Sequence, residues 1–287
     1  MSNTMTVEYG RTRDGVLAAR VGNQAFAMMP RDNGHHIVKA WGLPGTIEDW
    51  TAADFYGGSH RPVDEAGFRE TVEEWASHQR QLAVLGRSST SALRSTPWGQ
   101  SQHAVVYGPG IVFHHTASHG GFELTADRNT GIHLLLRSDN GFYEEDCAWA
   151  AVAAAFPELF TDLERRDADE ILKQVYPDAW ETIHGATLDR GQSRAKDRRS
   201  FDAENAERWV AISAILSTQN PGFVECIATL GGRRGGKSIG SRSGETVEQR
   251  FLVAEDLYDI GEFGYVIDEK QDQPYDGPSS FVGSSPQ

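Results

Sequence analysis

The sequence predicts an α+β protein made of small antiparallel sheets packed with helices, without a doubly wound parallel sheet. Short apolar segments joined at glycine turns indicate strands, and longer segments with apolar residues at helical spacing indicate surface helices. With 287 residues, of which 39% are hydrophobic, the chain can bury one large core or two small ones. No internal repeat is visible.

The first ninety residues predict a small α/β region. Residues 15–30 form two apolar strands that meet at Gly22 and Asn23, where a tight hairpin can close, and residues 35–42 can add a third strand. Residues 64–85 predict a helix, because apolar side chains recur on one face among charged ones. The polar residues 86–96 then predict a linker.

Residues 91–268 predict a second, α+β domain. It begins with two strands in residues 103–115, which turn at Gly108, Pro109 and Gly110. A helix should start near Cys147, with Asp146 as its cap. The remaining predicted elements are helices at residues 168–176 and 202–217 and strands at residues 223–230, 247–254 and 263–267. Residues 269–287 are polar and predict a flexible tail.

Charge and cysteine content restrict the class of protein. The net charge of −14 argues against a general basic surface that coats nucleic acid. Two cysteines are too few for a disulfide scaffold, which predicts a reducing compartment. The N-terminus lacks the pattern of an export signal, and no apolar run reaches the roughly 18 residues of a spanning helix. We therefore expect a cytoplasmic protein that makes no membrane contact.

Three sequence segments together resemble a known family. They are TPWGQSQ at residues 96–102, HTASHGGFEL at residues 115–124, and GFYEEDCAWA followed by FPELF within residues 141–160. They resemble an uncharacterised domain-of-unknown-function family of proteobacterial plasmids, integrative elements and phages. Residues 249–268 look like the closing part of its longer members. The resemblance implies a mobile-element setting and no particular chemistry.

Cys147 is the first candidate catalytic residue. At a helix start its thiolate would be stabilised by free amides, and His114, His115 or His119 could act as the base. The three acidic residues before it, Glu144, Glu145 and Asp146, oppose this by disfavouring a second negative charge. We therefore expect either a helix cap beside an inert cysteine or, alternatively, a thiol site that uses Cys147, His119 or His114, and Glu145.

The same residues offer a second candidate, a metal site. His114, His115 and His119 with one carboxylate from residues 144–146 are plausible ligands for zinc or iron. On a strand His114 and His115 point to opposite faces, so only one of them could join His119. Because this spacing is unsuitable, the sequence predicts no bound metal and no cofactor.

The third candidate is the glycine-rich segment GGRRGGKS, residues 231–238. It satisfies the pattern of a phosphate-binding loop, but the residues that follow predict no helix, so nucleotide binding is not expected. Its basic character suggests another role, since no acid interrupts residues 231–244. Phosphate groups of nucleic acid, or an acidic partner, could be bound by Arg233, Arg234, Lys237 and Arg242.

Two hypotheses about function follow. The first is an accessory protein of a mobile genetic element that acts by contacts with a host protein or with nucleic acid. The alternative is a hydrolase-type enzyme with the Cys147–histidine site or the histidine–carboxylate metal site. The sequence favours the first, because no enzyme site has the spacing that its chemistry requires.

Overall fold

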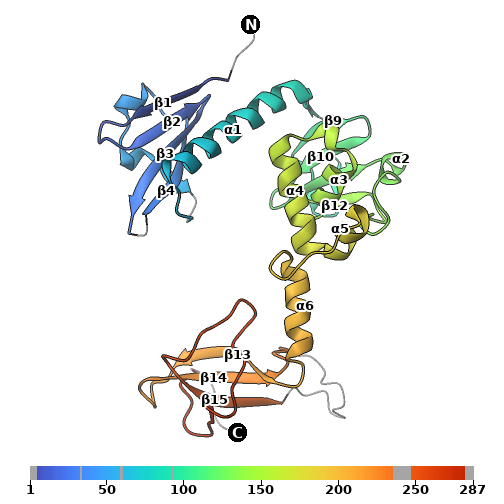
Figure 1. Cartoon of the computed structure of the whole chain (residues 1–287). Helices are drawn as coiled ribbons and strands as arrows, with labels where there is room; N and C mark the ends of the chain where they lie inside the picture. The colour runs from blue at the N-terminus through green and yellow to red at the C-terminus, as the bar shows by residue number, and fades with distance from the viewer. Residues whose placement is uncertain (1–4, 33, 59–60, 92–93, 235–246, 282–287) are drawn as a thin grey trace. The chain divides into compact units, whose positions relative to one another are not determined.

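A computed structural model describes residues 5–32, 34–58, 61–91, 94–234 and 247–281. The chain divides into two compact units, Met1–Gly185 and Ala186–Gln287. Both units combine antiparallel sheet with helix, and none of the strand pairs in the described residues is parallel, which confirms the α+β class (Figure 1). No helix in the described ranges has the length and apolarity needed to span a membrane.

The chain begins with a five-stranded antiparallel meander. Its strands are β1 Val7–Arg11, β2 Leu17–Val21, β3 Gln24–Arg31, β4 Gly34–Trp41 and β5 Tyr56–Gly58, each paired with the next in sequence. The predicted hairpin is confirmed, since Val21 pairs with Gln24 and Gly22 supplies the positive φ of 58° at the turn. One face packs on Ile47 and Trp50 from the connection between β4 and β5, and the other packs on helix α1.

Helix α1, Glu65–Leu85, matches the predicted helix at both ends. The Asp64 carboxylate accepts a hydrogen bond from the Gly67 amide at 2.8 Å, and Gly86 closes the helix in the left-handed conformation. Phe68, Val72 and Ala76 are buried against the sheet. Local capping signals and one apolar face therefore suffice to define this element.

The second sheet of this unit carries the residues of the candidate site. Its strand order is β12-β11-β10-β9-β6, formed by β6 Ser88–Thr90, β9 His103–Gly108, β10 Ile111–His115, β11 Gly120–Leu124 and β12 Phe142–Glu144. The strands at residues 103–115 are confirmed. The predicted linker is wrong for Ser88–Thr90, which pair with β9. A small hairpin, β7 Ser95–Thr96 and β8 Gly99–Gln100, follows β6.

Helices after the sheet differ from the prediction in their bounds. Helix α3 is Trp149–Ala155, so it begins two residues after Cys147, and Asp146 does not cap it. Helix α4 is Asp162–Val175, because the capping box of Thr161 and Glu164 starts it earlier than expected. The remaining helices of the unit are α2 Ala126–Asn129 and α5 Pro177–His184. Apolar side chains of α3, α4 and α5 share one core with β10, β11 and β12.

The second unit is a four-stranded antiparallel sheet preceded by helix α6, Arg194–Glu204 (Figure 1). Its strands are β13 Trp209–Leu216, β14 Phe223–Leu230, β15 Glu248–Ala254 and β16 Gln273–Pro274. The strands predicted at residues 223–230 and 247–254 are confirmed. Residues 263–267 meet β13 at a single bridge, between Val210 and Val266, and form no strand of their own.

Two predictions for this unit are wrong. Residues 202–217 are not one helix, because Asn205 ends α6 and the β-branched residues of β13 pair with β14. Residues 269–281 have fixed structure, since β16 pairs with β15 and the Ser280 amide bonds to the buried Glu225 carboxylate at 2.7 Å. Residues 282–287 lie outside the described part of the chain.

Candidate functional site

The histidines of strand β10 lie on opposite faces of the sheet, as expected for neighbouring strand residues. His115 pairs with Gly120 of β11 and with His103 of β9, and its ring stacks on that of His103 at 5.6 Å between centroids. Burial and the neighbouring His103 lower the pKa of His115, against an opposite effect of Glu145. A Cβ on Gly120, the β11 partner of His115, would lie 2.5 Å from Glu145 Oε2, so His115 and Glu145 lie on the same side of the sheet.

His114 lies on the other face and is 1% exposed. Its Nδ1 is 3.0 Å from the Ser101 hydroxyl, and its Nε2 is 3.1 Å from the Glu123 carboxylate, which also pairs with Arg94 at 2.6 Å. This order of serine, histidine and acid resembles a catalytic relay. Ser101 is only 1% exposed, however, so a substrate has no access to its hydroxyl. The group holds residues 94–101 against the sheet.

The residues that carry the family resemblance pack against one another beside this group. Trp98 covers Gly121, where an added Cβ would lie 2.4 Å from the indole ring. The same indole meets the Phe142 ring edge-to-face at 5.9 Å. One residue from each of the three segments thus forms a single contact, which gives a packing reason for their occurring together.

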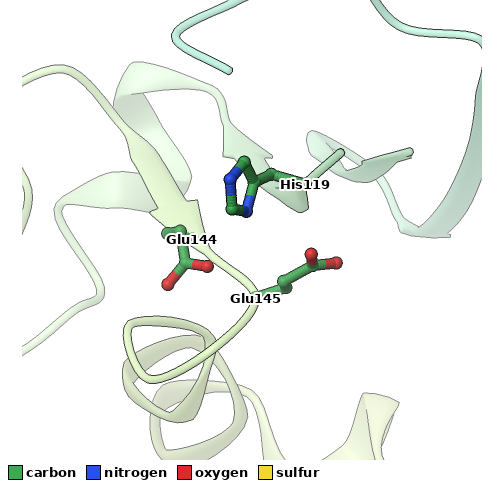
Figure 2. A group of neighbouring side chains, drawn as sticks. All are labelled: His119, Glu144 and Glu145. Carbon is green, nitrogen blue, oxygen red and sulfur yellow. The ribbon is translucent and has the colours of Figure 1, made fainter. Parts of the chain in front are cut away.

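His119, Glu144 and Glu145 come together at the end of strand β12 (Figure 2). One possible ligand atom from each residue lies within 4.8 Å of the others. His119 is held in the β10–β11 turn, because its carbonyl oxygen accepts hydrogen bonds from the Thr116 amide at 2.8 Å and hydroxyl at 2.7 Å. The Glu145 amide donates to the Gly120 carbonyl at 3.0 Å, which fixes Glu145 beside the same turn.

His103, which was not among the predicted site residues, belongs to the same end of the sheet. The turn centred on Pro109 makes His103 and His115 partners in the β9–β10 register. That register follows from the predicted hairpin, so the signal was present in the sequence.

Cys147 lies in the turn between β12 and α3, without the support expected of a nucleophile. Burial raises the pKa of its thiol, and Glu144 and Asp146 raise it further. Among the residues that the structure describes, no hydrogen bond joins its sulfur to a histidine ring. His114, on the other face of the sheet, is bonded to Ser101 and Glu123 instead.

Slow alkylation is therefore expected for Cys147. At neutral pH the thiolate fraction is smaller than that of a free thiol, so iodoacetamide should label Cys147 more slowly than glutathione. Peptide mass spectrometry separates this label from the buried Cys226, whose pKa is raised to about 12, mainly by burial. His119→Ala should leave the Cys147 rate unchanged. Fast labelling that depends on His119 would restore the thiol site.

A basic groove lies in the second unit. It has a volume of about 660 Å³ and includes Arg198 of α6 together with Arg233 and Arg234, which follow β14. Arg198 pairs with Asp202 at 2.8 Å and lies over the Phe263 ring, while Arg234 donates to the Ile212 carbonyl. Asp202 and Glu262 are the acidic residues of the lining. Lys237 and Arg242, and with them the end of the GGRRGGKS pattern, lie outside the described residues.

The structure is thus that of an α+β protein with two candidate sites. One unit has the histidine–carboxylate cluster, and the other has the arginine-lined groove. Residues 91–206 match the family described as "Domain of unknown function (DUF7007)". The matched residues include strands β9 to β12, which carry the cluster, and helix α6. No curated protein and no solved structure matches the chain.

Proposed function

We propose that this protein is an accessory protein of a mobile genetic element and that it acts by binding nucleic acid. The mobile-element setting rests on the resemblance of residues 96–160 to a family of plasmids, integrative elements and phages. The observation that carries the binding activity is the groove in which Arg198, Arg233 and Arg234 share one lining. Phosphate groups are the ligands that such guanidinium groups bind best.

The groove joins a helix to a loop between strands. Arg198 belongs to α6, while Arg233 and Arg234 follow β14 after two glycines and are exposed. Two consecutive glycines, Gly231 and Gly232, both with φ of 67°, turn the chain out of β14 and direct it along the groove. The fold therefore gathers basic side chains that lie more than thirty residues apart in a chain of net charge −14.

The overall negative charge gives this proposal a specific form. A protein with net charge −14 is repelled by a phosphate backbone at long range, so binding has to come from a few close contacts. Each phosphate contact contributes a slope of about −0.9 in the logarithm of the binding constant against the logarithm of salt concentration. The proposal thus predicts a small, measurable salt slope.

The test is the binding of a fluorescent DNA duplex to the full chain by anisotropy, over a series of salt concentrations. Arg233→Gln with Arg234→Gln should weaken binding at low salt and reduce the magnitude of the slope by about two, since two contacts are lost. The matched control is Arg190→Gln with Lys270→Gln, which removes the same charge from the same unit outside the groove lining.

The control should change binding much less than the groove variant. Equal losses in the two variants would mean that only total charge matters. Absence of binding by the intact protein at low salt, to duplex DNA, single-stranded DNA and RNA alike, would end the proposal. Loss of binding by the groove variant with an unchanged circular dichroism spectrum would support it.

The enzyme alternative gains no support from a thiol site. Cys147 has a raised pKa and, within the described residues, no histidine partner. The histidine–carboxylate arrangement is different, because its side chains do come together.

A further inference from the structure

We propose that His119, Glu144 and Glu145 form a divalent-metal centre for a transition metal such as Zn²⁺ or Mn²⁺. Their spacing in the sequence argued against such a centre, because His114 and His115 were the expected partners of His119. The fold instead places two of the three carboxylates of the acidic run, those of Glu144 and Glu145, beside the turn that carries His119 (Figure 2).

The geometry of three adjacent strands produces this arrangement. Glu144 is the last residue of β12 and pairs with Gly121, and the Glu145 amide then extends the ladder to the Gly120 carbonyl. His119 directly precedes Gly120. The side chains of two consecutive glutamates can approach one ring because the strand ends between them and a turn begins.

Gly120 provides the space for the Glu145 carboxylate. A Cβ at this position would lie 2.5 Å from Glu145 Oε2, closer than side-chain atoms approach one another. It would also lie 3.0 Å from the His114 carbonyl oxygen. The carboxylate therefore occupies a volume that any other residue at position 120 would fill.

A second observation, independent of the clustering, points to a missing ligand. Glu144 Oε1 is buried and has no hydrogen-bond partner. An isolated buried carboxylate oxygen is costly, and such atoms in folded proteins are normally bound to a donor, a water or an ion. No ion pair to Glu144 or Glu145 occurs within the described ranges. A cation bound between the two carboxylates would supply the missing partner.

The chemistry of the ligand set selects the metal. One imidazole and two carboxylates suit Zn²⁺, Mn²⁺ or Fe²⁺ better than a soft ion, which prefers thiolates. Ligand atoms at about 2.1 Å from one ion are at most about 4.2 Å apart, so the 4.8 Å cluster closes by a small movement of side chains. Three protein ligands leave at least one position for water, as in catalytic rather than structural sites.

The experiment uses the full chain without an affinity tag, treated with a chelator and then titrated with Zn²⁺ and with Mn²⁺. Isothermal titration and elemental analysis should give one equivalent of one of these metals per chain. Binding should also raise the melting temperature, because the ion binds only the folded state. His119→Ala and the pair Glu144→Gln with Glu145→Gln should each weaken binding by at least about tenfold and abolish the thermal shift.

Matched controls keep the test specific. His133→Ala and Glu158→Gln remove an exposed histidine and an exposed glutamate elsewhere in the same unit, and both should bind as the parent does. Cys147→Ser should also retain the metal. Three outcomes would overturn the proposal. They are loss of the metal in Cys147→Ser, substoichiometric binding by the parent chain, and binding by His119→Ala that equals that of the parent. Folded variants are confirmed by circular dichroism, so loss of binding cannot come from unfolding.

Discussion

Replacement of Arg250 by alanine should destabilise the second unit by about 3–5 kcal/mol, because it leaves a buried carboxylate without its counter-charge. Arg250 Nη1 lies 2.9 Å from Glu225 Oε1, and the Glu225 side chain is 0% exposed. The other donors to this carboxylate are the Ser279 hydroxyl at 3.0 Å and the Ser280 amide at 2.7 Å. These neutral donors cannot replace the positive charge.

Urea unfolding followed by hydrogen exchange of the β14 and β15 amides measures this loss in the correct unit. Arg190→Ala is the matched control, since Arg190 is 76% exposed and should change stability by less than about 0.5 kcal/mol. Replacing both Arg250 and Glu225 by methionine should recover much of the loss, because no charge then remains buried. A loss below about 1 kcal/mol in Arg250→Ala would contradict the assignment.

The same pair predicts sensitivity to acid. Burial alone would raise the pKa of Glu225, but hydrogen bonds from the Ser280 amide, Arg250 and Ser279 lower it overall. A carboxyl group whose pKa is lower in the folded than in the unfolded state stabilises the fold above the unfolded value of about 4.3. That contribution is lost as the pH falls below this value. In Glu225→Gln the protonation step is absent, so unfolding should depend less on pH.

Arg87→Ala should destabilise the first unit by about 2–4 kcal/mol. This loss is smaller than the one expected for Arg250→Ala, because the ion pair of Arg87 with Glu164 is not completely buried. The two side chains are 12% and 21% exposed and are joined by bonds of 2.6 and 2.8 Å. Arg87 also donates to the Leu159 carbonyl at 2.8 Å, and its guanidinium lies 3.9 Å from the centre of the Tyr107 ring. One residue therefore connects the end of α1 to the start of α4.

Thermal and urea unfolding of the full chain measure this effect, with Arg166→Ala as the control. Arg166 lies on α4, as Glu164 does, and pairs with Glu74 on the surface. Its side chain is 59% exposed, so its loss should cost less than about 1 kcal/mol. Glu164→Gln keeps the capping geometry and removes the charge. Its loss of stability should lie between those of Arg87→Ala and Arg166→Ala. Equal effects for Arg87→Ala and Arg166→Ala would mean that burial of the first pair contributes little.

The elements that the sequence predicted correctly are those with local signals. Helix α1 has Asp64 at its start, Gly86 at its end and a single apolar face. The β2–β3 hairpin has a glycine at its turn. The failure at residues 202–217 has a clear cause. Trp209, Ile212 and Ile215 recur at helical spacing, but their side chains are of types that favour strands, and the pairing of β13 with β14 decides the outcome.

The candidate site shows the same division. The sequence identified the segment that holds His119, Glu144 and Glu145, because polar residues are concentrated there. It could not give their distance, since that depends on how β11 pairs with β12 across the connection formed by residues 125–141. Likewise, Arg198 was not associated with Arg233 and Arg234, because their proximity arises from packing between α6 and the end of β14.

The strand order of the N-terminal meander has a consequence for the order of folding. Each of its strands pairs with its neighbour in sequence, and the connections between the first four strands are short, so these pairings lose little chain entropy. The second unit is different, because the bond that satisfies Glu225 joins residues 55 positions apart. We therefore expect the meander to form early from local contacts. The Glu225 carboxylate should stay hydrated until the segment with Ser279 and Ser280 packs against it and excludes water.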